Sequence, residues 1–182
     1  AAPMPLMDNV GLTIKESLPL VSDILHKYGL RDRIKVIASG KLVTPSEVAW
    51  ALAVCADFVT SARGFTFSLG CIQALKCNKN TCPTGITTHN KRLQKGLNPE
   101  DKAAKVANFC LNMIHEVEVI SHSCGVARPR LMKRKHVRIV QDTGRSAPMD
   151  ELYPRPEILS EYKDVAASLA PEPEKKHGSY CG

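Results

Sequence analysis

The spacing of apolar residues predicts an amphipathic helix close to the start of the chain. Four apolar residues recur at intervals of four, three and four: Ile14, Leu18, Val21 and Leu25. This spacing places them on one helical face, and the helix is expected to end near Gly29. Pro19 lies inside the segment. With Ser17 as the N-cap, Pro19 falls in the tolerant first turn, whereas with Thr13 as the N-cap it kinks the helix.

Two short apolar runs then predict strands, each followed by a helix. Residues 34–38 are nearly continuously apolar, which is typical of a strand buried on both faces, and residues 58–61 form the second run. Between them, Thr44-Pro45-Ser46-Glu47 is a capping signal for a helix that runs to about Cys55. Another helix is expected from about Phe65 to Lys76. The order strand, helix, strand, helix predicts parallel pairing in an α/β fold.

The C-terminal third changes character along its length. A broad apolar surface predicts a long helix from Asp101 to about Ser123, which stops at Cys124-Gly125. From Ala127 onward Pro, Arg and Lys become frequent, and residues 170–176 have the composition of a disordered tail. We therefore expect a folded unit over residues 1–126, an extension packing on it over 127–160 and a disordered tail over 161–182.

Composition limits the class of protein. The 182 residues, 43% hydrophobic, suffice for one modest core. The net charge of +7 is expected to be spread along the chain. The densest run of basic residues, Lys133 to Arg138, is typical of a solvated face. Seven cysteines, with three inside twelve residues, do not match a secreted disulfide framework and favour the reducing cytoplasm. No apolar run reaches the roughly eighteen residues of a membrane span, so we expect no membrane association.

Two consecutive strand-to-helix turns carry glycine and a cation. These are Ser39, Gly40 and Lys41 after the first strand, and Ala62, Arg63 and Gly64 after the second. Glycine lets the backbone approach a ligand and present free N–H groups, which favours phosphate at the carboxyl end of parallel strands. The alternative is that each glycine serves only the geometry of its turn.

Cys71, Cys77 and Cys82 have a C-x5-C-x4-C spacing. Soft thiolates favour an iron–sulfur cluster, zinc or copper(I). Zinc would need a fourth ligand, for which His89 is the nearest candidate. Three cysteines with a proline after the last suit a cluster, and unligated thiols are equally compatible with the spacing. The six histidines show no pairing with a carboxylate or nucleophile, so no catalytic residue can be named.

Five motifs occur in the order found in one enzyme family. They are Ile37-Ala38-Ser39-Gly40-Lys41, Cys55-Ala56-Asp57, Leu69-Gly70-Cys71-Ile72-Gln73, Asn80-Thr81-Cys82-Pro83-Thr84-Gly85 and Glu151-Leu152-Tyr153-Pro154. Over residues 1–155 the chain resembles the FMN-binding domain of glutamate synthases, closest to its single-domain members. The resemblance implies the C-terminal portion of an FMN-binding (β/α)8 TIM barrel. It further implies that the two glycine turns bind the FMN phosphate and that the three cysteines on loop 71–85 ligate a 3Fe-4S cluster.

The implied function is that of a glutamate synthase-like oxidoreductase. In this family, 2-iminoglutarate made from 2-oxoglutarate and ammonia is reduced to L-glutamate by hydride transfer from FMN, with electrons entering through the cluster. The electron donor would be a ferredoxin or an NAD(P)H-oxidising subunit. Alternatives are a non-catalytic iron–sulfur or zinc scaffold and a nucleic-acid-binding fragment. Nucleic-acid binding rests only on Lys133 to Arg138, without a recognisable motif, and is disfavoured.

Two departures from the family pattern matter. Family members have a Gly-Gly-Thr-Gly segment before the Ala-Ala-Pro at which this chain opens, so strands 1 to 6 of the barrel are expected from an upstream segment or a companion chain. This chain alone is then an incomplete catalyst. Cys55 stands where the family commonly has glycine, and a left-handed cap would strain it, so the helix before it is expected to end differently.

Overall fold

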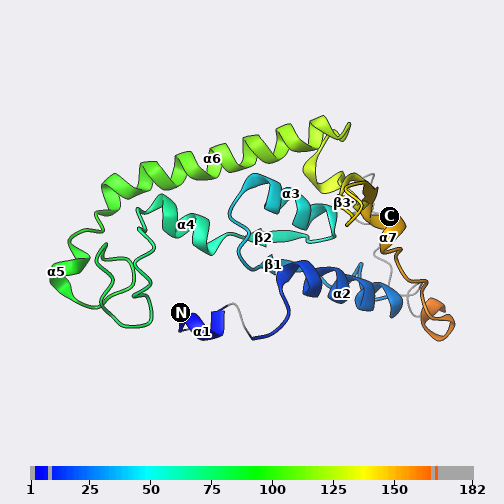
Figure 1. Ribbon diagram of the computed structural model, residues 1–182, viewed down its shortest axis with the longest axis horizontal. Helices are drawn as coiled ribbons and strands as arrows, with labels where there is room; N and C mark the ends of the chain where they lie inside the picture. The colour runs from blue at the N-terminus through cyan, green and yellow to red at the C-terminus, as the bar shows by residue number, and fades with distance from the viewer. Residues whose placement is uncertain (1–2, 8–9, 165–166, 168–182) are drawn as a thin grey trace.

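The computed structural model describes residues 3–7, 10–164 and 167, and it has an α/β architecture (Figure 1). Its helices and strands are α1 (Met4–Met7), α2 (Ile14–Lys27), β1 (Ile37–Ser39), α3 (Pro45–Ala53), β2 (Phe58–Thr60), α4 (Ala62–Ser68), α5 (Lys91–Gln94), α6 (Pro99–Ser123), β3 (Arg138–Val140), β4 (Ser146–Pro148) and α7 (Met149–Leu152). In the described residues, none of these helices combines the length and apolar character that crossing a lipid bilayer requires.

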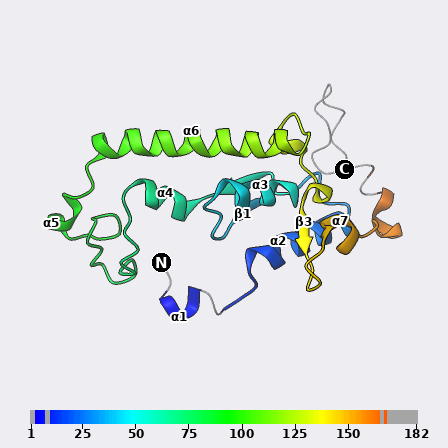
Figure 2. The same ribbon diagram turned by 45° about the horizontal axis from the view of Figure 1, so that its top comes forward.

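The central unit is a parallel strand pair connected through a helix. Ile37 lies opposite Phe58 and Ser39 opposite Thr60, so β1 and β2 run in parallel, as the alternating pattern predicts. Helix α3 is the crossover between the strands, and the long helix α6 runs along α3 and α4 (Figures 1 and 2). The carboxyl ends of β1 and β2 therefore meet at one edge of the sheet.

Helix α3 begins at the predicted capping box. The Thr44 side chain accepts a hydrogen bond from the Glu47 N–H at 3.4 Å, and Glu47 Oε2 accepts one from the Thr44 N–H at 2.9 Å. Pro45 occupies the first helical position, where its missing N–H costs nothing. Two otherwise unpaired N–H groups are thus satisfied, which confirms this helix start.

The end of α3 corrects the expectation for Cys55. The Cys55 N–H donates to the Leu52 carbonyl at 3.1 Å, and the Ala56 N–H donates to the Ala51 carbonyl at 2.9 Å. This is a Schellman motif, and Cys55 adopts its left-handed conformation at φ +89°. The helix therefore ends as it would with glycine, and a side chain there costs about 1 kcal/mol of backbone strain.

Helices α2 and α6 form where the apolar spacing predicted them, whereas α4 differs from its predicted range. Thr13 is the N-cap of α2, so Pro19 lies inside the helix, and α6 closely matches its predicted range. Helix α4 was expected from about Phe65, but it begins at Ala62, so Gly64 lies within its first turn. It also ends early, because Gly70 at φ +94° closes a second Schellman motif.

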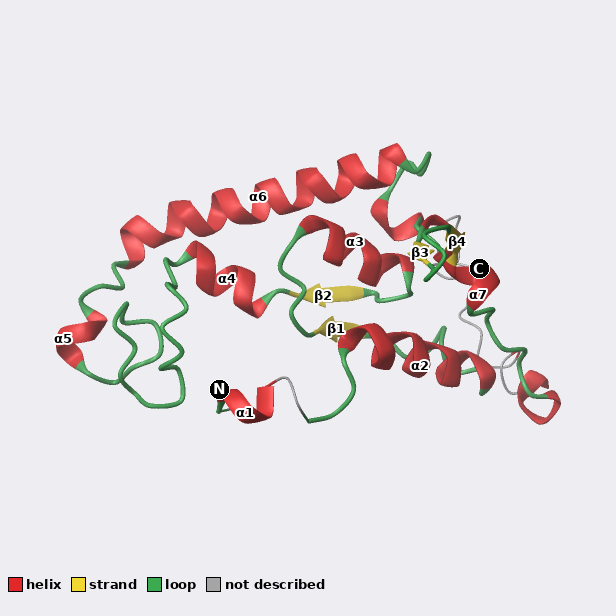
Figure 3. Cartoon of the chain, viewed as in Figure 1, coloured by secondary structure: helices red, strands yellow, loops and turns green. Residues whose placement is uncertain are grey.

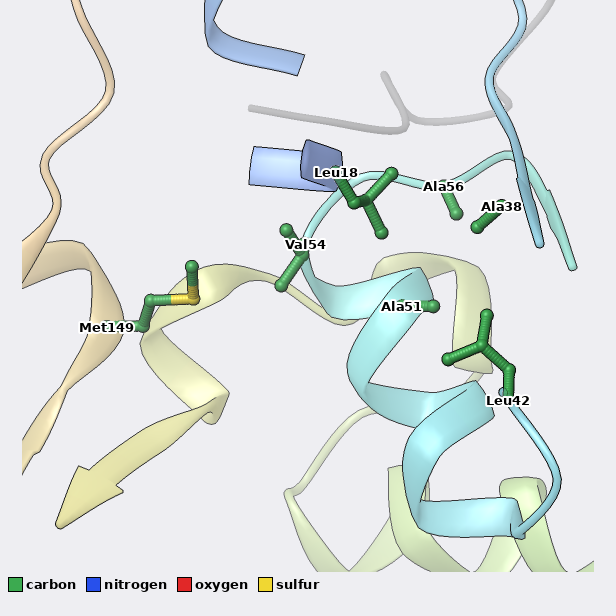
Figure 4. Packing of buried hydrophobic residues seen from close by; sticks show 7 residues of the cluster. All are labelled: Leu18, Ala38, Leu42, Ala51, Val54, Ala56 and Met149. Carbon is green, nitrogen blue, oxygen red and sulfur yellow. The ribbon is translucent and has the colours of Figure 1, made fainter. Parts of the chain in front are cut away.

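Side chains from five segments form the main core (Figure 4). Its buried members are Leu18, Ala38, Leu42, Ala51, Val54, Ala56 and Met149. A second cluster joins α3 to α6 and consists of Ala49, Ala53, Val117 and Met132. Alanines on two sides of α3 let both clusters pack closely against it. Complete burial of a side chain such as Leu18 contributes about 1.5 to 3 kcal/mol.

One face of the β1–β2 pair is largely uncovered. Ile37 keeps 65% of its surface exposed and Phe58 keeps 49%, whereas Ala38 keeps only 2%. The prediction of a strand buried on both faces is therefore wrong for the described chain, because its helices cover the Ala38 face alone. Two short strands cannot close a barrel. The TIM barrel thus stays a prediction, and what the structure shows is a parallel α/β portion.

The C-terminal part packs back onto the N-terminal helix. Strands β3 and β4 form an antiparallel hairpin, and Met149 of α7 enters the main core. The buried Arg134 guanidinium donates two hydrogen bonds to the Asp23 carboxylate, at 2.6 and 3.1 Å. The domain limits at residues 126 and 160 stay predictions. Most of the expected disordered tail, residues 165–166 and 168–182, lies outside the described residues.

Candidate functional site

The two glycine turns follow neighbouring strands. Because Ser39 lies opposite Thr60, the turn that begins at Gly40 and the turn that begins at Ser61 leave the same edge of the sheet. Lys41 is held in the left-handed region at φ +55°, a conformation that non-glycine residues adopt rarely. The topology thus brings the two predicted phosphate turns to adjacent positions.

The two turns do not line one cavity. Ser39, Gly40 and Lys41 line an open groove of about 1220 Å³, together with the start of α2 and part of the β3 hairpin. Ala62, Arg63 and Gly64 are not among its lining residues. Among the described residues, the turn after β1 therefore lines a groove that the turn after β2 does not share.

The turn after β2 has room for glycine alone. A Cβ atom at Gly64 would lie 2.5 Å from Ser61 Oγ and 2.7 Å from Cζ of Phe109, which packs there from α6. The Ser61 hydroxyl is buried and has no hydrogen-bond partner among the described residues. The first N–H groups of a helix have no intrahelical acceptor. An unpaired hydroxyl, free amides and the exposed Arg63 are donors of the kind that a phosphate oxygen accepts, so the residues present fit such a group.

A buried ion pair holds the opposite end of the two strands. Arg31 and Asp57 lie 2.9 Å apart with side chains only 6% exposed. The same Asp57 oxygen accepts the Val36 N–H at 2.7 Å, and Arg31 also donates to the Cys55 carbonyl at 2.6 Å. The pair thereby fixes where β1 and β2 begin. Sequence reasoning missed this role, although a lone carboxylate directly before a buried strand could have signalled it.

The cysteine loop starts at a fixed point. The Cys71 N–H donates to the Thr66 carbonyl at 3.1 Å and is part of the cap that ends α4. Cys71 is half-buried, Cys77 is exposed, and Cys82 is buried at 8% exposure. The green loop between α4 and α5 in Figure 3 carries all three. Each predicted ligand is therefore on the same loop, in three different environments.

Cys82 has the most distinctive chemistry of the three thiols. Burial alone would raise its pKa, but hydrogen bonds from the Thr84 side chain and the Thr87 backbone outweigh burial and lower the pKa to about 6. The distance from Cys82 Sγ to Thr84 Oγ1 is 3.2 Å. A thiol with this pKa is largely ionised at neutral pH, and the thiolate is the form that binds metal.

Hydrogen bonds within the loop fix its shape. Asn80 accepts two hydrogen bonds. The Thr88 hydroxyl donates to its backbone carbonyl at 2.7 Å, and the His89 N–H donates to its side-chain oxygen at 2.6 Å. Gln94 of α5 donates to the Thr88 carbonyl at 2.8 Å. Gly85, at φ +80°, packs so closely that a Cβ would lie 2.3 Å from the Leu93 carbonyl oxygen. The segment after Cys77 is consequently folded against α5.

The described residues do not gather a metal site. Within them, no three His, Cys, Asp or Glu side chains are arranged to hold an ion, and His89 completes no zinc site with the cysteines. Three thiols on one loop, one with a lowered pKa, fit an iron–sulfur cluster by donor chemistry. In the described residues, the three cysteine side chains are not arranged around one metal position. The ligand set therefore stays a prediction.

Comparison with known proteins places these features in a family. Residues 1–127 match the model of the conserved region in glutamate synthase. The chain is 42% identical over 147 residues to the glutamate synthase large subunit-like protein YerD of Bacillus subtilis, covering 81% of this chain and 28% of that protein. It is 34% identical over 126 residues to archaeal glutamate synthase (NADPH) of Methanocaldococcus jannaschii, covering 69% of this chain and 25% of that protein.

The match also extends to a larger enzyme. Over 117 residues the chain is 30% identical to the glutamate synthase (NADPH) large chain of Bacillus subtilis, of which it covers 8%. The chain spans about a quarter of the length of the first two relatives. The matched residues include the parallel strand pair, both glycine turns and the cysteine loop. This chain belongs to the glutamate synthase family.

Proposed function

We propose that the chain is the FMN-phosphate-binding and cluster-bearing portion of a glutamate synthase-like oxidoreductase. One observation carries the proposal: two adjacent βα turns, whose hydroxyl, amide and cationic groups can donate hydrogen bonds to a phosphate, are followed directly by a loop with three cysteines, of which Cys82 has a lowered pKa. This arrangement would place an anion site and an electron-transfer site on one short stretch of chain. Relatives named as glutamate synthases support the reaction class.

Each group of residues has a stated part in this proposal. Ser39, Gly40 and Lys41 would hold the FMN phosphate from the β1 side, and Ala62, Arg63 and Gly64 from the β2 side, through backbone N–H groups and two cations. Cys71, Cys77 and Cys82 would ligate the 3Fe-4S cluster. When bound, FMN supplies hydride transfer to 2-iminoglutarate, and the cluster supplies single electrons. The protein's own task is to position both groups.

Completion by further chain is part of the same proposal. Ile37 and Phe58 are exposed on strands whose unpaired edges would invite pairing. The relatives are about four times as long as the matched region. We therefore place the remaining strands of the barrel, and the groups that hold the flavin ring and substrate, on an upstream segment or a companion chain. Without it, this portion would not complete a reaction cycle.

A second candidate is a non-catalytic iron–sulfur or zinc scaffold. The observation that favours it is that the two glycine turns do not line one groove among the described residues, so that they do not form a joint phosphate site there. Under this alternative the cysteine loop binds metal or another protein, and no flavin is held. The two candidates differ in flavin and sulfide content.

The experiment is anaerobic purification of the protein that contains this chain, with iron, acid-labile sulfide, zinc and flavin analysis. The proposal expects flavin together with iron and sulfide. Cys82→Ser should lose the iron, and Cys110→Ser, which changes an exposed cysteine on α6, should retain it. Zinc without sulfide would overturn the cluster. Iron retained in Cys82→Ser would overturn the ligand assignment.

A further inference from the structure

Cys82 differs from the other two predicted ligands in what surrounds its sulfur. Its side chain is 8% exposed, whereas Cys71 is half-buried and Cys77 is exposed. Thr84 Oγ1 lies 3.2 Å from Cys82 Sγ, and the backbone N–H of Thr87 also donates to that sulfur. In the part of the chain that the structure describes, no hydrogen bond reaches the sulfur of Cys71 or Cys77. Hydrogen-bond donors are therefore gathered at one of the three thiols.

The Thr87 hydroxyl is a further donor close to this sulfur. It is near enough to lower the pKa of Cys82, but its oxygen is buried and has no well-aligned hydrogen bond among the described residues. Buried polar groups in folded proteins are nearly always hydrogen-bonded, so an unpaired hydroxyl beside a proposed ligand indicates a bound group with acceptor atoms. An iron–sulfur cluster supplies such acceptors through its sulfur atoms.

The fold of the loop holds both threonines in place. The Gly85 N–H donates to the Cys82 carbonyl at 3.2 Å, which closes the turn that carries the first threonine. Directly after the second threonine, the Thr88 hydroxyl donates to the Asn80 carbonyl at 2.7 Å, and Gln94 donates to the Thr88 carbonyl at 2.8 Å. Donors held in this way lose little freedom when they bind, so both hydroxyls are preorganised around the sulfur.

Ligation decides the direction of the hydrogen bond between Thr84 and Cys82. A cysteine that binds metal does so as the thiolate, which has no proton to donate. The Thr84 hydroxyl is then the donor and Cys82 Sγ the acceptor. Hydrogen bonds to its sulfur atoms are one of the factors that set the reduction potential of a cluster. Because reduction adds negative charge, a donor stabilises the reduced form and raises the potential, whereas the burial of Cys82 acts in the opposite direction.

We propose that Thr84 and Thr87 are positioning residues whose hydroxyl groups hydrogen-bond the sulfur at Cys82 and raise the reduction potential of the cluster. The inference rests on the proposed function, because it requires the cluster to be bound. Reduction adds one electron, which the ferredoxin or NAD(P)H-oxidising donor supplies, and it neither breaks a bond nor removes a proton in either threonine. The two hydroxyl groups therefore act by stabilising charge, and they offset the cost of burying it.

The test is a redox titration of the intact protein, purified anaerobically, with dithionite as the reductant. The oxidised three-iron cluster gives an electron paramagnetic resonance signal, and the change of this signal with potential reports reduction. Thr84→Val and Thr87→Val each remove one hydroxyl and keep the shape of the side chain. Thr84→Ser keeps the hydroxyl and is the conservative rescue. The matched control is Thr81→Val, at the exposed threonine that precedes Cys82.

Thr84→Val and Thr87→Val should each shift the one-electron equilibrium toward the oxidised form by at least about threefold, which corresponds to a potential about 30 mV lower. Thr84→Ser and Thr81→Val should shift this equilibrium by less than about 1.5-fold. An equal shift in Thr81→Val, or no recovery in Thr84→Ser, would overturn the proposal, because disturbance of the loop would then explain the result. An unchanged potential in Thr84→Val with its full iron content would overturn it too. If Thr84→Val loses its iron, an unchanged potential in Thr87→Val has the same consequence.

Metal content separates this inference from the proposed function. Iron and acid-labile sulfide are measured on the same samples as the potentials. Normal iron and sulfide with unaltered potentials in both valine variants would overturn the inference and leave the proposed function standing. Unmodified protein without iron and sulfide would defeat the proposed function and this inference with it.

Discussion

Asp57→Ala should destabilise the chain by about 3 to 5 kcal/mol, because it leaves the buried Arg31 charge without its carboxylate. Both side chains are about 6% exposed, so water cannot replace the lost partner. The substitution also leaves the Val36 N–H without the acceptor that it has at 2.7 Å, which alone costs about 1 kcal/mol or more. Since single domains have only about 5 to 15 kcal/mol of stability, this loss is large.

Urea unfolding followed by circular dichroism measures the effect. Arg31→Met with Asp57→Leu removes both charges and should be closer to the unmodified protein than Asp57→Ala, because a buried pair replaced by apolar residues is often neutral. Asp101→Ala breaks an exposed pair with Lys105 and should change little. A loss below about 1 kcal/mol for Asp57→Ala, or a double variant less stable than the single one, would refute the reasoning.

Three further predictions concern the loop, the pH dependence and the extension. Gly85→Ala should open the cysteine loop, seen as faster proteolysis between residues 77 and 98, because its Cβ would clash with the Leu93 carbonyl at 2.3 Å; unchanged proteolysis would contradict this. Backbone hydrogen bonds from Thr44 and Val43 hold the pKa of Glu47 below its ordinary value of 4.5. Its contribution is therefore present above about pH 4.5 and is lost as pH falls through the lowered pKa, so the stability advantage over Glu47→Gln should shrink there and stay constant at neutral pH. Met149→Ala should cost about 2 to 5 kcal/mol in chemical unfolding, and a cost near zero would mean that α7 does not belong to the core.

Local rules account for the elements that were predicted well. The capping residues of α3 act within one helical turn, so a few neighbouring residues suffice to place this helix start, and the apolar surface of α6 predicted that helix to within two residues of its observed start at Pro99. The parallel pairing also follows from the order of elements along the chain. The end of α4 was missed because the helix was expected to continue through Gly70 to Lys76, whereas Gly70 takes the left-handed conformation that ends it.

Long-range contacts could not be predicted from the chain alone. Arg134 and Asp23 are separated by 111 positions, and nothing local to either residue specifies the other. The same holds for the packing of Phe109 against the Gly64 turn, which leaves the Ser61 hydroxyl buried and unpaired. The cysteine spacing likewise did not say which thiol is buried, because that depends on where Thr84 and the folded loop lie.

The sequence by itself determined the start of α3, the parallel strand pair, the glycine turns and the family, because each depends on residue order over short distances. Tertiary structure alone decided that Cys55 takes a left-handed conformation, that one face of the strands is open and that hydrogen bonds from Thr84 and Thr87 lower the pKa of the buried Cys82. The physical reason is that burial and electrostatic environment depend on which distant segments meet. Cys82 shows both parts: its place in the cysteine spacing is visible in the sequence, and its burial and lowered pKa are properties of the fold.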